Sequence, residues 1–228
     1  MRTRNLHGPL LLAVWQFAPL SVTQDSLGTH RVSVGYGTGQ FEDRTLSCAG
    51  DVLSAAPAPY QEVGVQLDFW RDRYRYTVYA GRHSTDLSTY AGLFSGAAVA
   101  WEGQYFGIGT GVSSVSGSDG FTSPSAYLRL GNLDRVHLFM DVLSPTPTLG
   151  MSGLARTGLG FNRGHLRGSS GRVGIDLPLH ADEAYPFGVS GEWLTPLTGN
   201  TDLIVQGRWA PSEEHASWGT GLGLRYSF

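Results

Sequence analysis

Apolar and polar side chains alternate along most of this chain, and the alternation is clearest in its last segment. Residues 218–228 have the sequence WGTGLGLRYSF, with Trp, Thr, Leu, Tyr and Phe at the even positions and Gly, Arg and Ser at the odd ones. Successive side chains of a strand point to opposite faces. The segment therefore predicts a strand with one apolar face and one face that is small or charged.

The same two-residue period recurs from residue 29 onward and predicts about twelve strands. Between residues 60 and 70, for example, Val63 and Val65 alternate with Glu62 and Gln66. The predicted strands are Thr29–Gly39, Tyr60–Trp70, Tyr74–His83, Tyr90–Trp101, Tyr105–Val115, Ser125–Gly131, Arg135–Leu143, Gly153–Phe161, Ser170–Leu179, Pro186–Thr195, Thr201–Ala210 and Trp218–Phe228.

The predicted connections alternate between short turns and longer loops, as in a barrel whose two ends differ. The long connections are Gln40–Pro59, Ser116–Pro124 and Ser144–Ser152, and short ones include 71–73 and 132–134. Asn162–Ser169 is longer than a turn at the short end should be. A ten-stranded barrel is therefore the alternative to a twelve-stranded one.

The end of the chain resembles that of the outer-membrane β-barrels of Gram-negative bacteria. The last strand ends on an aromatic, Phe228, with Tyr226 two residues before it. The resemblance implies an all-β protein, a single antiparallel transmembrane β-barrel, located in the outer membrane. It also implies that the barrel-assembly machinery recognises Tyr226 and Phe228, and that the surroundings are outer-membrane lipid and lipopolysaccharide.

Composition agrees with strands and turns. The chain has 32 glycines and only 15% charged residues, and no apolar run is as long as a membrane-spanning helix. The net charge of −3 gives no reason to expect nucleic acid as a partner. Residues 1–23 have the outline of a signal peptide, with Arg2 and Arg4 before an apolar stretch, which leaves 24–228 as the barrel domain.

Two features favour a membrane barrel over a soluble barrel or sandwich. Aromatic residues flank the predicted turns, as Trp70 and Tyr74 do, and such rings form girdles at membrane interfaces. The face opposite the apolar one carries both signs of charge, which suits a lumen where guanidinium groups meet carboxylates. The residues predicted to line the lumen are Arg31, Glu62, Asp68, Arg75, Glu102, Arg129, Asp141, Arg156, Arg172, Asp176, Glu192, Arg208 and Arg225.

Histidines are where catalysis would have to reside. His83, His180 and His215 are predicted at the outer rim near carboxylates, where a histidine can act as a general base. No nucleophile motif accompanies them. His137 and Asp141 share one face but lie roughly 13 Å apart along a strand, too far for a direct pair. No cofactor and no metal site is predicted, because His and Cys do not occur at ligand spacing.

The leading functional hypothesis is a passive pore for small polar solutes. A non-conducting barrel that anchors or scaffolds protein partners is the alternative, and an outer-membrane hydrolase is the third possibility. Glycines alternate on the predicted lumen face, as at Gly107, Gly109 and Gly111. Three roles are possible for these glycines. They could leave space inside the barrel, accommodate a closely packed group, or make the wall smooth enough to bend and close.

Overall fold

The computed structural model describes residues 30–46, 52–85, 92–116, 121–132, 135–143, 154–166, 169–178, 187–211 and 216–228. No helix among these residues is long and apolar enough to cross a membrane. Several predictions fall outside the described residues, namely the signal peptide of residues 1–23, the connection Ser144–Ser152, and His180 and His215.

The described residues form twelve strands, so the predicted count is confirmed and the ten-stranded alternative is wrong. The strands are β1 (Arg31–Leu46), β2 (Val52–Arg71), β3 (Tyr74–Thr85), β4 (Gly92–Glu102), β5 (Phe106–Ser116), β6 (Phe121–Gly131), β7 (Val136–Leu143), β8 (Leu154–Leu166), β9 (Ser169–Pro178), β10 (Gly188–Pro196), β11 (Thr201–Ala210) and β12 (Ser217–Ser227).

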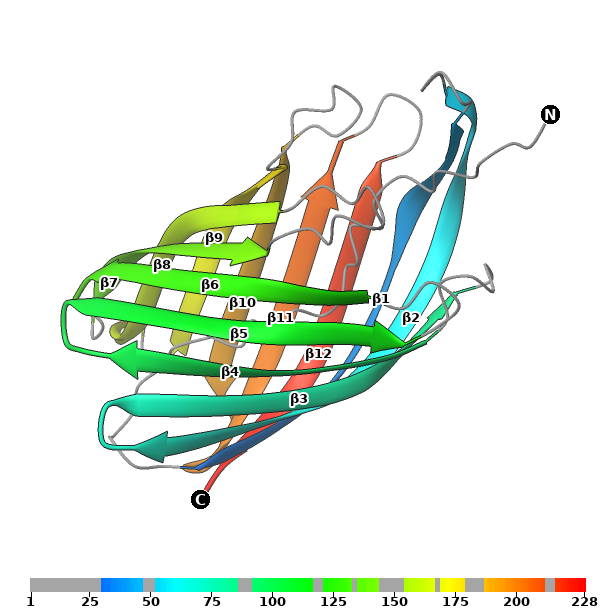
Figure 1. Cartoon of the computed structure of the whole chain (residues 1–228). Coiled ribbons are helices and arrows are strands. Elements are labelled where there is room, and N and C mark those ends of the chain that lie inside the picture. The colour runs from blue at the N-terminus through cyan, green and yellow to red at the C-terminus, as the bar shows by residue number, and fades with distance from the viewer. Residues whose placement is uncertain are drawn as a thin grey trace.

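The strands form a closed antiparallel barrel. Each strand pairs with the next in the chain, and β1 pairs with β12, from Arg31 opposite Ser227 to Gln40 opposite Trp218. Figure 1 shows β12 in red beside β1 in blue. His30 and Phe228 extend this seam by two backbone hydrogen bonds of 3.1 and 2.9 Å. Closure gives both terminal strands a backbone partner, which a sheet in lipid requires.

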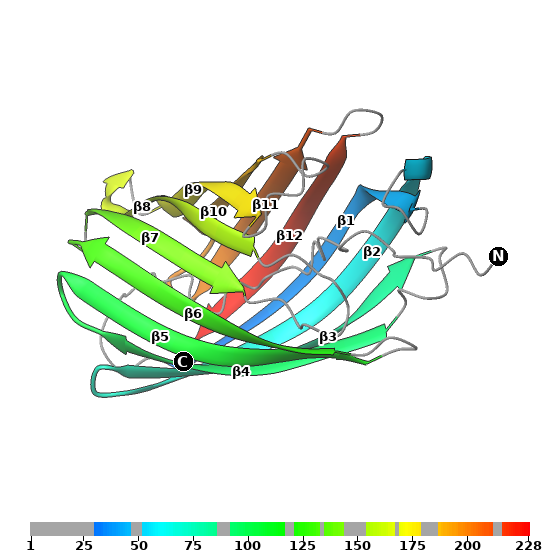
Figure 2. The ribbon, with the colours of Figure 1, turned by 45° about the horizontal axis from the view of Figure 1, so that its top comes forward.

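The strands run obliquely around the barrel. In Figure 2, β4–β7 cross in front of β10–β12 at a steep angle. A sheet can close into a barrel only if its strands tilt relative to the barrel axis.

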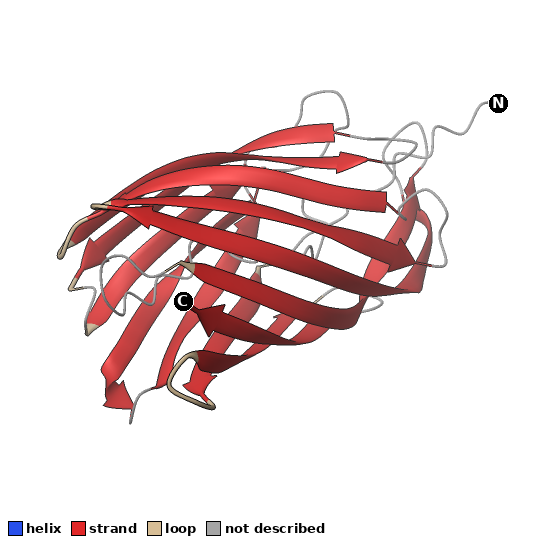
Figure 3. Ribbon diagram, turned by 90° about the horizontal axis from the view of Figure 1, so that it is seen from below, coloured by secondary structure: helices blue, strands red, loops and turns tan. Residues whose placement is uncertain are grey.

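The two ends of the barrel differ in their connections. The turn end carries the connections 72–73, 103–105, 132–135 and 197–200, together with His30 and Phe228, and the loop end is the opposite one. Short described connections gather at the turn end in Figure 3. Positive φ angles occur at two of these turns, 54° at Asp72 and 111° at Gly131, the last residue of β6. Aspartate and glycine are residues that adopt this conformation readily.

The prediction of a long loop at Gln40–Pro59 is wrong, because most of this segment is strand. β1 continues to Leu46 and β2 begins at Val52, and the two pair with each other along this extension. Their other neighbours stop earlier: β12 pairs with β1 only as far as Gln40, and β3 pairs with β2 only as far as Tyr60. Residues 41–46 and 52–59 thus form a two-stranded ribbon beyond the barrel wall (Figure 1, upper right). A hairpin ladder needs only backbone groups, so the lack of apolar alternation did not prevent it.

Two further connections are shorter than predicted. β8 continues to Leu166 and β9 begins at Ser169, with a register irregularity between Phe161 and Leu166. Within the predicted loop Ser116–Pro124, β6 already begins at Phe121 and pairs with β5. Both segments are polar or rich in glycine and serine. Their side chains therefore lack the apolar alternation that would have predicted a strand.

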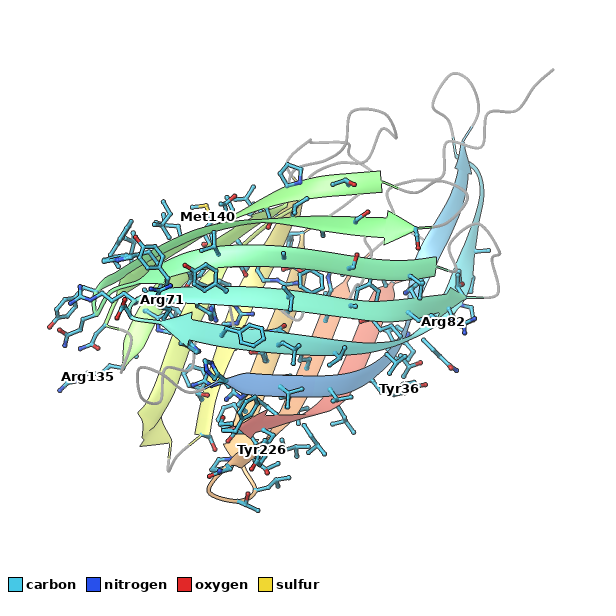
Figure 4. The ribbon with its side chains drawn as sticks, turned by 60° about the horizontal axis from the view of Figure 1, so that its bottom comes forward. Tyr36, Arg71, Arg82, Arg135, Met140 and Tyr226 are labelled. Atoms are coloured by element: carbon cyan, nitrogen blue, oxygen red, sulfur yellow. The ribbon has the colours of Figure 1, made fainter. Side chains whose placement is uncertain are left out.

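The two faces of the wall are inverted relative to a soluble barrel. Most outward valines and leucines are exposed, for example Val65 at 40% and Leu222 at 59%, whereas the inward Arg129 and Asp176 are 0% and 1% exposed. Figure 4 shows outward side chains such as Tyr36 and Met140 standing away from the ribbon. This is the arrangement predicted for a barrel whose outer face contacts lipid.

Aromatic side chains mark both ends of the outer face. Tyr74, Tyr226 and Phe228 are exposed near the turn end, and Trp209 and Trp218 face each other across β11 and β12 near the loop end. The predicted place of Trp70 in this girdle is wrong. Trp70 shares the parity of Glu62 and Asp68, points inward, and is only 6% exposed.

Candidate functional site

The inner wall of the barrel carries the candidate site. In the described part of the chain it holds all thirteen charged residues predicted for the lumen, nine of them buried and Asp141, Arg156, Glu192 and Arg208 partly exposed. It also holds Asp202, which the sequence analysis missed. Asp202 has the same parity as Gln206 and Arg208 on β11, and that parity was the available signal. With Asp202, seven arginines face seven carboxylates.

A first group, the turn-end cluster, is centred on Glu102 of β4. Its Oε1 lies 3.4 Å from Nη2 of Arg75 on β3, and its Oε2 lies 3.3 Å from Nη2 of Arg129 on β6. All three side chains are almost completely buried. A carboxylate shared by two guanidinium groups offsets both of their buried charges.

Gly107 on β5 makes the contact between Glu102 and Arg129 possible. Gly107 pairs with Glu102 on one side and with Arg129 on the other, so it lies directly between them. A Cβ atom added at Gly107 would lie 2.5 Å from Oε2 of Glu102 and 3.3 Å from Nε of Arg129. The glycine therefore leaves the path of this ion pair open across β5.

Trp70 belongs to the same cluster. The guanidinium carbons of Arg31 and Arg75 lie 6.0 and 5.5 Å from its ring centroid. An indole ring attracts cations through its electron-rich face. The inward position of Trp70 thus gives two buried arginines a common contact.

A second group, the Asp176 cluster, lies on β8–β11. Asp176 accepts a 2.6 Å hydrogen bond from Nε of Arg156 and a 3.1 Å bond from Ser190. Nε of Arg208, on β11, lies 2.8 Å from the other carboxylate oxygen. Arg208 reaches β9 across β10, so this cluster also spans an intervening strand.

A third group, the Arg172 cluster, comprises Asp141, Arg172, Glu192, Gln206 and Phe139. Its ion pairs are long, with Nη1 of Arg172 3.5 Å from Asp141 and Nε of Arg172 3.8 Å from Glu192. Gln206 donates a 2.7 Å hydrogen bond to Oε2 of Glu192. The guanidinium carbon of Arg172 lies 5.0 Å from the ring centroid of Phe139.

Two further contacts of charged side chains join adjacent strands. Arg225 on β12 donates two hydrogen bonds, of 3.1 and 2.8 Å, to Oδ2 of Asp202 on β11. Asp68 on β2 accepts a 2.6 Å bond from Thr77 on β3. In barrel order, each ion pair described here joins neighbouring strands or strands separated by one other.

Other inward glycines lie beneath large side chains. Tyr60 of β2 lies across Gly39 of β1 and Gly219 of β12, whose added Cβ would meet the Tyr60 ring or hydroxyl. Phe94 covers Gly81 in the same way. Of the three roles considered for the alternating glycines, close packing of an inserted group therefore applies at these positions.

The histidine predictions are changed by the structure. His83 was expected at the solvated rim, but it is 1% exposed, lies on the inner face, and stacks on Tyr60 with ring centroids 5.4 Å apart. Its Nδ1 lies 3.6 Å from Glu62. His137 is also buried, and Asp141 pairs with Arg172. Within the described ranges, no three His, Cys, Asp or Glu residues are grouped so as to hold a metal ion.

No family model and no curated protein matches this sequence. Solved structures do match. An outer membrane channel from Pseudomonas putida F1 superposes with a TM-score of 0.59 at 13% identity, over 90% of this chain and 97% of that one. The translocator domain of the autotransporter NalP from Neisseria meningitidis gives 0.55 at 11% identity, over 90% of each chain. The monoaromatic hydrocarbon channel CymD gives 0.54 at 8% identity, over 93% of this chain and 92% of that one.

At these identities the likeness concerns the fold alone. The chain has the fold of the Gram-negative outer-membrane β-barrels, which confirms the resemblance inferred from its C-terminal strand. Its exposed apolar outer face is suited to lipid. The predicted location in the outer membrane is thereby confirmed.

Proposed function

We propose that this barrel is a passive outer-membrane channel for small polar solutes. The observation that supports it most is the course of the ion pairs, which follow the wall between near-neighbour strands. Charges compensated along the wall do not need a partner across the lumen. None of the ion pairs described here has to cross the lumen, and this supports a passage along the axis.

The inner faces of β4 and β5 support the same proposal. Beside Phe94 and Glu102, the inward positions of β4 and β5 include small neutral residues such as Ala98, Gly109 and Gly111. Side chains just fill the interior of eight-stranded barrels, and the diameter grows with strand number. A twelve-stranded barrel with small residues on one wall has room for a narrow polar passage.

Conductance tests the proposal. Purified protein reconstituted in planar bilayers is expected to give small, steady single-channel currents. Arg208→Ala should shift the ion selectivity toward cations, because Asp176 then keeps only Arg156 as its arginine partner. Arg82→Ala is the matched control, since Arg82 is exposed on the outer face and lies outside the lumen (Figure 4).

A second candidate, a non-conducting barrel that scaffolds partner proteins, is favoured by the ribbon of residues 41–46 and 52–59. This ribbon projects past the strands beside it and offers backbone edges beyond the wall. Electrically silent barrels that co-purify stoichiometrically with another envelope protein would replace the channel proposal with this one. For the hydrolase hypothesis, His83 lies near the loop end of β3 but is buried against Tyr60 instead of being solvated.

Lipopolysaccharide, outer-membrane lipid and the barrel-assembly machinery remain the proposed partners. The exposed outer face supports lipid contact, and the exposed rings of Tyr226 and Phe228 support recognition of the last strand during assembly. These two rings stack with centroids 6.2 Å apart on the outer face of β12.

A further inference from the structure

The Arg172 cluster is paired more loosely than the Asp176 cluster beside it. Nε of Arg156 and Nε of Arg208 contact Asp176 at 2.6 and 2.8 Å, whereas Arg172 stands 3.5 and 3.8 Å from its two carboxylates. Hydrogen bonds between charged groups are normally shorter than 3 Å. Arg172, Asp141 and Glu192 therefore attract one another without completing their hydrogen bonds.

The unfilled hydrogen-bonding capacity can be counted atom by atom. Nη1 of Arg172, both carboxylate oxygens of Asp141 and Oε1 of Glu192 are buried and have no hydrogen-bond partner. These are one donor group and three acceptor atoms. Buried polar atoms are normally satisfied, by protein, by water or by a ligand.

We propose that the Arg172 cluster is a binding site for small zwitterionic solutes of the α-amino acid type. This inference rests on the proposed channel function and names its substrate class. An ammonium group brings three N–H donors, which match the three free acceptors of Asp141 and Glu192. A carboxylate brings the acceptor that Nη1 of Arg172 lacks. Neither a simple anion nor a simple cation satisfies both halves of the cluster.

The surrounding wall holds these groups in place. Arg172 lies opposite Glu192 in the β9–β10 register, and Gln206 fixes Oε2 of Glu192 from β11. The ring of Phe139 on β7 lies within 5.0 Å of the Arg172 guanidinium carbon. On β8, between Arg172 and Asp141, the inward position Gly158 has no side chain, whereas the ring of His137 lies over Gly160. The site is thus built from rigid strands, which hold a binding constellation more accurately than loops do.

Calorimetry and conductance together test the site. L-alanine is expected to bind the detergent-solubilised barrel saturably and to reduce the ion current of the reconstituted barrel in a concentration-dependent way. Trimethylglycine has the carboxylate but no N–H donor, and propylamine has the ammonium but no carboxylate. Each should bind at least about tenfold more weakly, because a hydrogen bond to a charged group is lost.

Variants locate the binding. Arg172→Gln should weaken alanine binding at least about tenfold, whereas Arg82→Gln on the outer face should leave it unchanged. Because Arg172→Gln leaves two carboxylates without their arginine, the double variant Asp141→Asn/Arg172→Gln provides a second test with a smaller charge imbalance. It should also lose alanine binding while remaining inserted and heat-modifiable.

The outcomes separate the site from the channel. A barrel that conducts ions but does not bind alanine, or binds it equally well in both Arg172 variants, overturns the zwitterion site and leaves the channel proposal standing. A barrel that binds alanine through Arg172 but is electrically silent keeps the site and overturns the channel. The absence of both binding and current overturns both.

Discussion

Single residues decide how the inner wall tolerates its charges. Glu102, Arg75 and Arg129 are almost fully buried, and a buried charge is tolerated only when it is paired and hydrogen-bonded. Their pairing depends on a residue without a side chain, Gly107, which lies between two of them. The same principle applies at Gly219, which lies beneath Tyr60.

Gly107→Ala should therefore destabilise the barrel. The added methyl group would lie 2.5 Å from Oε2 of Glu102 and must displace the carboxylate or the strand. We expect the free energy of unfolding to fall by about 1–3 kcal/mol, as for other overpacked sites. Urea-induced unfolding in lipid vesicles measures the change.

Gly207→Ala is the matched control for this prediction. Gly207 lies on β11, and an added Cβ there has nothing within 4 Å. Its free energy of unfolding should stay within about 0.5 kcal/mol of the wild type. If both substitutions lowered the free energy of unfolding equally, the lack of space above Gly107 would not be the cause.

Individual strands have different tasks in this fold. β1 and β12 close the barrel, and the seam ends in the backbone hydrogen bonds between His30 and Phe228. β1 and β2 also continue beyond the wall as a ribbon that pairs only with itself in the described residues. The seam therefore closes the sheet, and the ribbon extends the loop end of the barrel.

Deleting Phe228 should impair assembly more than its loss of contacts alone would suggest. The deletion removes an exposed ring, the stacking partner of Tyr226, and two hydrogen bonds of the seam. We expect much less heat-modifiable, membrane-inserted protein in cells. The control is Leu197→Ala, which truncates an exposed side chain of a turn. Normal insertion of the protein that lacks Phe228 would refute the prediction.

The barrel as a whole is arranged around its inverted faces. Apolar side chains cover the outside and charged ones the inside, so lipid is the solvent of the outer wall. Arg82 is an outward charge, and it lies near the loop end of β3, where a long side chain reaches the membrane surface. Depth in the membrane should therefore decide the effect of any new outward charge.

Val78→Arg and Ser84→Arg test this on the same face of one strand. Val78 lies in the middle of β3 and is 43% exposed, so its replacement puts a charge near the bilayer midplane and should cost about 2–4 kcal/mol. Ser84 lies next to the end of β3, where the same charge should cost about 0–1 kcal/mol. Unfolding in vesicles compares the two, and equal effects would contradict a lipid-facing outer wall.

The strand count, the two faces and the charged set of the inner wall could be predicted from the amino-acid sequence. Each follows from a two-residue period, which is local to a strand and independent of its neighbours. The chain end at Tyr226 and Phe228 added the class of fold. Asp202 and the inward Trp70 were within reach of the same period, had it been applied to every residue of β11 and β2.

Only the tertiary structure decided which residues meet. Glu102 reaches Arg129 across Gly107, and Tyr60 lies over Gly39 and Gly219, because the register of several strands places these residues in one row. The length of β1 and β2 and the loose pairing of Arg172 likewise depend on partners distant in the chain. A period within one strand carries no information about the register between strands, so the contacts between side chains of the inner wall become visible only when the sheet has closed.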